Sequence, residues 1–165
     1  MTRALFALAG AALFLLACDP VHSNEIDALG GETPGVRTGP NHRPGQPCLL
    51  CHDGKIGDPR QFSIAGTVFV NPYDKVAASG ATIIMTDANN VVFTTTTNQA
   101  GNFYVTPSQW TPAYPMTVEV DYQRYQTKMR SHIGRDGSCS GCHFDPAGFD
   151  SPGHVAVAYP DGGVP

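Results

Sequence analysis

Two copies of one five-residue motif account for four of the five cysteines in this chain. Residues 48–52 read CLLCH and residues 139–143 read CSGCH, so both have the form C-x-x-C-H. The remaining cysteine, Cys18, stands far upstream and makes the total odd. A framework made only of disulfides would therefore leave one thiol over. The arrangement of cysteines is the strongest constraint that the sequence places on this protein.

The C-x-x-C-H spacing is typical of covalent haem attachment. Two thiols one turn apart can each add to a vinyl group of the same porphyrin, and the adjacent imidazole then lies over the iron as an axial ligand. The motifs resemble those of multihaem cytochromes c, which implies that His52 and His143 are the proximal ligands. We therefore expect two covalently bound haem c groups, attached through Cys48, Cys51, Cys139 and Cys142.

Two other uses of the four motif cysteines have to be weighed. Four thiols at this spacing could hold a zinc ion, and in an oxidising compartment they could instead form two disulfides. Both alternatives leave the histidine after each cysteine pair unexplained, so haem attachment is the preferred interpretation.

The sixth ligand of each iron is not dictated by the motifs. His42 lies ten residues before the first motif histidine, and His132 lies eleven before the second. This near-repeat suggests either that each segment brings its own upstream ligand or that the two segments exchange ligands. Met129 is the strongest sulfur candidate, and His154 could replace His132. Met85 and Met116 fall in strand patterns and are expected in the core.

The N-terminal stretch indicates export. Residues 4–17 form an unbroken apolar and small-residue run after Arg3, and fourteen residues are too few to span a bilayer as a helix. The run ends in LLAC, which resembles a bacterial lipobox and implies lipidation of Cys18. The alternative is an ordinary secretory signal with an unrelated cysteine. In either case we expect the mature chain outside the cytoplasm, facing the periplasm or the surface of a Gram-negative bacterium, with the choice between inner and outer membrane open.

Composition sets limits on domains and partners. A chain of 165 residues suits one domain, and a net charge of −4 leaves no basic surface for nucleic acid. Gly- and Pro-rich sequence without periodicity up to about residue 47 indicates a flexible linker after the signal. The expected division is a signal peptide (1–17), lipidated Cys and linker (18–41), first haem segment (42–60), β-sandwich (61–128), second haem segment (129–153), and last strand with tail (154–165).

Between the motifs the sequence alternates with period 2. Residues 116–123, MTVEVDYQ, place apolar and polar side chains on opposite faces of a strand. Similar runs are expected as strands at residues 61–70, 81–87, 91–97, 102–106 and 154–159. Turn residues separate them, so the expected fold class is mainly β, a small antiparallel β-sandwich with two haem-binding loop segments.

Two resemblances extend this interpretation. Residues 80–105, GATIIMTDANNVVFTTTTNQAGNFYV, resemble the carboxypeptidase regulatory-like, transthyretin-like β-sandwich, a likeness that is informative about fold and nearly silent about function. The longer pattern HRPGQPCLLCH, FSIAGTVF and MRSHIGRDGSCSGCH resembles dihaem c-type proteins of metal-respiring bacteria. That group often has Met where His42 stands, which implies an axial role for position 42.

The expected function is electron transfer at the cell envelope, without enzymatic activity. The partners would be other cytochromes or redox proteins, with extracellular acceptors or multihaem complexes as candidate acceptors, and the lipid would tether the chain to a membrane. One alternative is a haem enzyme, peroxidase-like or a small reductase, with one open iron. Another is a binding module with haem as sensor, whose aromatic residues would line a sugar surface, although such residues are more often core: Tyr104, Trp110, Tyr114, Tyr122 and Tyr125.

Overall fold

The computed structural model describes residues 20–157 except 33, 56 and 74. The chain divides into two units, residues 1–30 and 31–165. The first unit contains helix α2 (Pro20–Ala28), within the stretch that the sequence suggested as a flexible linker. The expected lipidation site Cys18 and its preceding apolar run lie outside the described residues. Among the residues described, no helix has the length and apolar character needed to cross a membrane.

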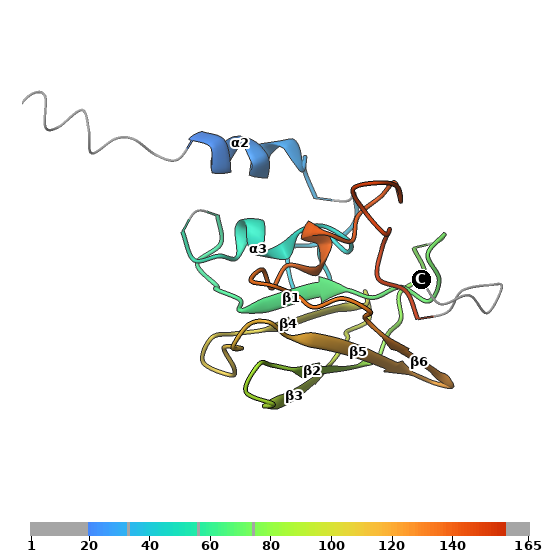
Figure 1. Ribbon diagram of the computed structural model, residues 1–165. Coiled ribbons are helices and arrows are strands. Elements are labelled where there is room, and N and C mark those ends of the chain that lie inside the picture. The colour runs from blue at the N-terminus through green and yellow to red at the C-terminus, as the bar shows by residue number, and fades with distance from the viewer. Residues whose placement is uncertain (1–19, 33, 56, 74, 158–165) are drawn as a thin grey trace, which may run out of the picture. The chain divides into compact units, whose positions relative to one another are not determined.

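The described part of the second unit is mainly β, with six strands in two antiparallel sheets (Figure 1). The two-stranded sheet pairs β1 (Ile64–Thr67) with β4 (Asn102–Val105). The four-stranded sheet has the order β3-β2-β5-β6, formed by β2 (Thr82–Thr86), β3 (Val92–Thr96), β5 (Thr117–Tyr122) and β6 (Tyr125–Lys128). The expected mainly β class is therefore confirmed.

Side chains from both sheets form one hydrophobic core. Ile64 and Val105 contribute from the small sheet, and Ile83, Met85 and Val120 from the large one. Met85 and Met116 are completely or almost completely buried, as expected for core residues. Four of the five aromatic residues weighed as a sugar surface pack against this core, whereas the fifth, in β4, is exposed.

The strands differ from expectation at two places. Within the described residues, which end at 157, the run from His154 contributes an isolated bridge in which Ala156 pairs with Phe69. Strand β6 was not expected, since the turn that precedes it lacks glycine and asparagine. Gln123 instead adopts the left-handed conformation (φ 57°) that this tight turn requires.

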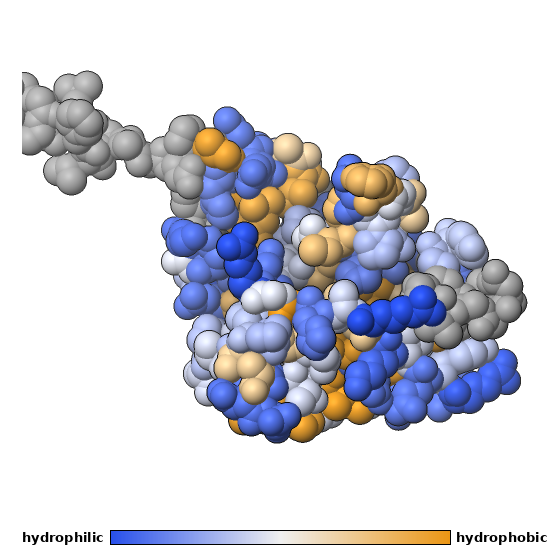
Figure 2. Space-filling model, viewed as in Figure 1, coloured by the Kyte–Doolittle hydropathy of each residue, from blue (hydrophilic) through white to orange (hydrophobic). Residues whose placement is uncertain are grey.

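Strand β1 holds a special position in the fold. All four of its residues are buried, whereas β2 alternates between buried and half-buried positions and β3 between half-buried and exposed ones. Figure 1 shows the single-turn helix α3 (Cys48–Cys51) and the 3₁₀ turn η1 (Cys139–Gly141) above this strand. The two motif segments cover the face of β1 that would otherwise meet solvent. Figure 2 shows that the visible surface is largely hydrophilic, interrupted by hydrophobic residues.

Candidate functional site: two paired motif segments

The first motif folds as one helical turn. Helix α3 carries Cys48 and Cys51 at its two ends, and the backbone N–H of His52 donates to the carbonyl of Cys48 at 3.0 Å. The next loop closes tightly on this turn, because the Asp58 N–H donates to the Cys51 carbonyl at 3.1 Å. Burial raises the pKa of the Cys48 thiol to about 11. The two thiols and the imidazole are thus held one turn apart.

The second motif repeats this local geometry. Turn η1 begins at Cys139, and the N–H of His143 donates to the Cys139 carbonyl at 2.9 Å. Burial raises the pKa of the Cys139 thiol to about 12, whereas Cys142 is exposed. The same residue pattern therefore produces the same backbone turn in two places.

The imidazoles of the two motifs make equivalent hydrogen bonds. Nδ1 of His52 lies 2.9 Å from the carbonyl oxygen of Arg60, and Nδ1 of His143 lies 3.0 Å from that of Gly153. A carbonyl oxygen only accepts, so Nδ1 carries the proton and Nε2 keeps its lone pair. Metal-binding histidines in proteins commonly have this arrangement. Both motif histidines are consequently prepared to bind a metal through Nε2.

His42 lies close to the first motif histidine. The ring centroids of His42 and His52 are 5.9 Å apart and their planes differ by 10°. An iron held by both histidines would need Nε2 of each imidazole to face it. Nδ1 of His42 also accepts from the Gly39 N–H at 3.3 Å. Iron binding through Nε2 would require this long, weak bond to break.

The segment that carries His42 is fixed to the small sheet. The side-chain amide of Asn102 in β4 donates to the carbonyl oxygens of Pro40 at 3.2 Å and His42 at 2.9 Å. The Gly45 N–H donates to the hydroxyl of Thr67 at 2.8 Å. This part of the expected linker therefore belongs to the folded unit and positions His42.

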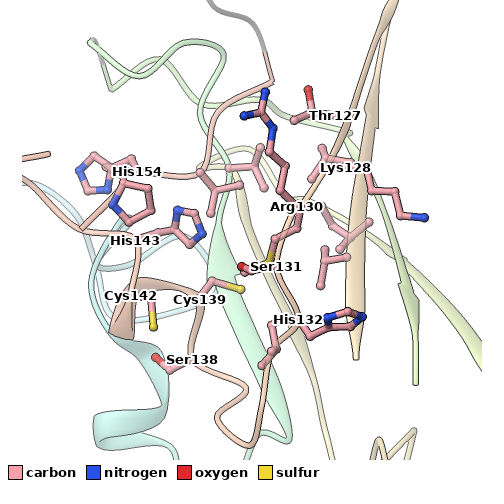
Figure 3. A pocket seen from close by; sticks show the side chains of 18 of the residues that line it. Thr127, Lys128, Arg130, Ser131, His132, Ser138, Cys139, Cys142, His143 and His154 are labelled. Atoms are coloured by element: carbon pink, nitrogen blue, oxygen red, sulfur yellow. The ribbon is translucent and has the colours of Figure 1, made fainter. Parts of the chain in front are cut away.

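A cavity of about 750 Å³ adjoins the second motif (Figure 3). Apolar residues of the sheets form part of its lining, and the segment after β6 contributes polar and charged residues. The lining includes every residue that the sequence suggested for the second site: Cys139, Cys142, His143, Met129, His132 and His154. The volume and the chemistry of the lining both suit a porphyrin-sized ligand.

The three candidate sixth ligands differ in their surroundings. His154 is buried, its ring centroid is 4.9 Å from that of Phe69, and its Nε2 lies 2.8 Å from a carboxylate oxygen of Asp145. His132 is exposed at the opposite side of the cavity from His143 in Figure 3. Met129 is half-buried, and its backbone N–H donates to Val118 at 2.9 Å. Burial lowers the pKa of His143, and the nearby His154 lowers it further.

The two motifs meet at strand β1 although they are far apart in the sequence. The Ala65 N–H donates to the carbonyl of Gly137, just before the second motif, at 3.0 Å. The Phe62 N–H, just before β1, donates to the carbonyl of His52 at 2.9 Å. Burial raises the pKa of the Cys139 thiol most, and the charge of Cys48 raises it further. One strand thus brings both motifs into a single site.

Several residues at this site were not identified from the sequence. The carbonyls of Arg60 and Gly153 orient the two imidazoles, but a backbone acceptor leaves no side-chain signature. Gly66 allows close approach, because a Cβ there would lie 2.7 Å from both Cβ and Sγ of Cys139. Gly66 carries no side chain that could have marked it as part of a site. Only their neighbours in space reveal their roles.

The described residues also bear on the alternative metal site. Within them, no group of three or more His, Cys, Asp or Glu side chains is arranged to hold a metal ion. The four motif cysteines are free thiols.

Comparisons with protein-family models, curated proteins and solved structures found no match for this chain.

Proposed function

We propose that this protein is a lipid-anchored dihaem c-type cytochrome that carries electrons at the cell envelope. The observation that supports it most is the repeated motif geometry. In both copies the thiols lie one turn apart and Nδ1 of the following histidine faces a backbone carbonyl. That combination suits covalent porphyrin attachment with iron bound through Nε2. A motif that merely occurred by chance would have no reason to produce the same imidazole arrangement twice.

The residues at each site would attach the haem, bind its iron or shield it from water. Cys48 and Cys51 would hold one haem, and Cys139 and Cys142 the other. His52 and His143 would be the proximal ligands. When bound, haem supplies reversible one-electron exchange. The chain's own part is to orient the imidazoles and to exclude water, which the burial of His52 to 4 % exposure favours.

The proposed sixth ligands are His42 at the first site and His132 at the second. His42 is favoured by its parallel ring 5.9 Å from His52. His132 is favoured because it lines the same cavity as His143, and Figure 3 shows the two side chains on opposite sides of the view. His154 is less suitable, since a carboxylate oxygen of Asp145 lies 2.8 Å from its Nε2, although this contact lacks the geometry of a hydrogen bond. Met129 remains the alternative to His132.

The wider assignment includes fold type and location. We propose that the two sheets form a carboxypeptidase regulatory-like β-sandwich, and that Cys18 carries the lipid. The envelope partners would be other cytochromes or redox proteins, with extracellular acceptors or multihaem complexes receiving the electrons. The adjacent placement of the motifs at β1 supports exchange between the two haems before transfer to such a partner.

Haem content tests the proposal directly. The full chain is produced with the export and cytochrome c maturation machinery, and haem per chain is measured by the pyridine haemochrome assay and by intact mass. Two covalent haems are expected, falling to one when Cys48 and Cys51 are both replaced by serine, and likewise for Cys139 and Cys142. Ser140→Ala in the second motif is the control and should retain two. A wild-type chain without covalent haem would refute the proposal.

Ligand binding separates a carrier from an enzyme. Two low-spin irons that bind carbon monoxide slowly and do not turn over peroxide are expected of the carrier. A high-spin iron with rapid peroxide turnover would instead identify a haem enzyme.

A further inference from the structure

The loop after the first motif contains a carboxylate that has no equivalent at the second motif. Oδ1 of Asp58 lies 3.6 Å from Nδ1 of His52, beside the Arg60 carbonyl that accepts the imidazole's hydrogen bond. At the second motif, the Nδ1 of His143 faces the Gly153 carbonyl, and the nearby Asp145 faces His154 instead. The two motif histidines therefore share a primary hydrogen bond and differ in the charge behind it.

Arg60 holds this carboxylate in place. Its Nε and one terminal nitrogen donate to the two oxygens of Asp58 at 2.7 and 2.6 Å, and its backbone N–H donates to Oδ1 at 2.8 Å. These bonds hold the pKa of Asp58 well below its usual range, so the carboxylate stays ionised at neutral pH. A bidentate pair of this kind fixes orientation as well as charge.

The loop is also anchored to the motif itself. The backbone N–H of Asp58 donates a hydrogen bond to the carbonyl of Cys51. Gly57 (φ 99°) lets the loop come this close, because a Cβ at that position would lie only 3.0 Å from the Cys51 carbonyl oxygen. Asp58 is therefore tied to the same turn that carries the first pair of thiols. Its distance from His52 is set by the fold and not by a mobile side chain.

We propose that Asp58, positioned by Arg60, lowers the reduction potential of the first site and so directs electrons from it toward the second. This inference rests on the proposed function. A negative charge behind the proximal imidazole stabilises the more positive, oxidised iron. In the step concerned, one electron leaves the reduced first site and enters the oxidised second site. The first is oxidised by one electron, the second is reduced by one, and no bond or proton changes.

Asp58 acts in this proposal as a positioning residue through His52. Part of its charge is balanced by Arg60, whose side chain is more exposed, at 53 % against 27 % for Asp58. Water screens the outer guanidinium more than the inner carboxylate. The carboxylate therefore dominates the field at Nδ1, although the pair is nearly neutral overall.

Two substitutions with opposite charge effects test the idea. Asp58→Asn removes the negative charge and should raise the potential of the first site, with about a tenfold change in the electron distribution between sites, or ~59 mV. Arg60→Gln keeps the backbone carbonyl and the carboxylate but removes the cation, and should lower the same potential. The reduction potentials of both variants are measured by spectroelectrochemical titration of the full-length holoprotein. The signal of the first site is the component that disappears in the Cys48→Ser/Cys51→Ser variant.

The controls separate charge from structural damage. Asp58→Glu should restore most of the original potential, whereas Asp121→Asn, the same charge change on β5, should leave both potentials nearly unchanged. Shifts of the same sign in Asp58→Asn and Arg60→Gln, or no shift in either, would overturn the inference while two bound haems still upheld the proposed function. A chain that binds no haem would instead remove the proposed function.

Discussion

The imidazoles of His42 and His52 lie nearly parallel, with ring centroids 5.9 Å apart, although neither residue belongs to a strand and a stretch of loop and helix separates them. The pairing depends on Asn102, whose side-chain amide holds the His42 carbonyl at 2.9 Å. It also depends on Phe62, whose ring is 4.3 Å from that of His52. Residues of the β scaffold thus bring the two histidines together.

If the chain binds two haems as proposed, replacing His42 should leave one iron without its sixth ligand. In the haem-loaded protein, His42→Ala is expected to convert one iron of the two from low spin to high spin and to allow it to bind carbon monoxide. The reason is that the nearest imidazole opposite His52 would be lost. Absorption and electron paramagnetic resonance spectra measure the change. His22→Ala, in the separate N-terminal unit, is the control, and a fully low-spin His42→Ala protein would exclude His42 as a ligand.

Adding a methyl group at Gly66 should displace the second motif alone. The Cβ of Gly66→Ala would lie 2.7 Å from the Cβ and Sγ of Cys139, closer than real contacts allow. Overpacking of this kind costs about 1–3 kcal/mol. We expect a lower midpoint of chemical denaturation and loss of one haem, with the first site retained. Gly31→Ala, where a Cβ meets nothing within 4 Å, is the control; equal loss of both haems would contradict the prediction.

The half-buried thiols of Cys48 and Cys139 should react slowly before a cofactor is attached. Burial raises the pKa of Cys48 to about 11 and that of Cys139 to about 12, and alkylating reagents attack the thiolate. In reduced protein produced without haem, iodoacetamide at pH 8 should modify the exposed Cys142 well before Cys139 of the same motif. Peptide mass mapping over time measures the order. Faster modification of Cys139 in folded protein would show that its burial is wrong.

The same raised pKa values predict how stability depends on pH in that haem-free form. A thiol whose pKa is higher in the folded state than its ordinary 9.0 keeps its proton better when folded. The folded state therefore binds more protons between about pH 9 and pH 12, and its stability falls as pH rises through that range. Urea unfolding should have a lower midpoint at pH 10.5 than at pH 8. Replacing Cys48 and Cys139 with serine should reduce this difference, and an unchanged difference would contradict the assignment.

Ser151 should stabilise the loop that orients His143. It is 3 % exposed, its hydroxyl donates to the Phe144 carbonyl at 2.6 Å, and it accepts from the N–H groups of Phe144 and Gly153 at 2.8 and 3.1 Å. Ser151→Ala leaves these buried groups unpaired, at a cost of about 1–3 kcal/mol. Chemical denaturation should show that loss, whereas Ser79→Ala on an exposed turn should show little. Equal stability of the two variants would refute the role.

Most of the scaffold could be predicted from local pattern. Alternation in residues 116–123 predicted β5, and the turn residues around Asp87 and Asn98 separated the strands correctly. The mainly β class follows from such short-range signals because side chains two residues apart share a face of a strand. The strand at β6 was missed because Gln123, in its turn, does not carry the usual turn signature. The run from His154 pairs through an isolated bridge within the described residues, because alternation alone does not provide a full partner strand.

The sequence by itself determined the chemistry of each motif: two thiols and an imidazole within five residues, whose spacing dictates one tight turn. The tertiary structure decided what surrounds them, because hydrogen-bond acceptors such as the carbonyls of Arg60 and Gly153 come from loops whose path depends on long-range packing. The tertiary structure also determined that both motif segments lie against strand β1. Only folding could bring residues 48–51 and 139–141 against the same strand, since no local rule relates residues so far apart in the chain.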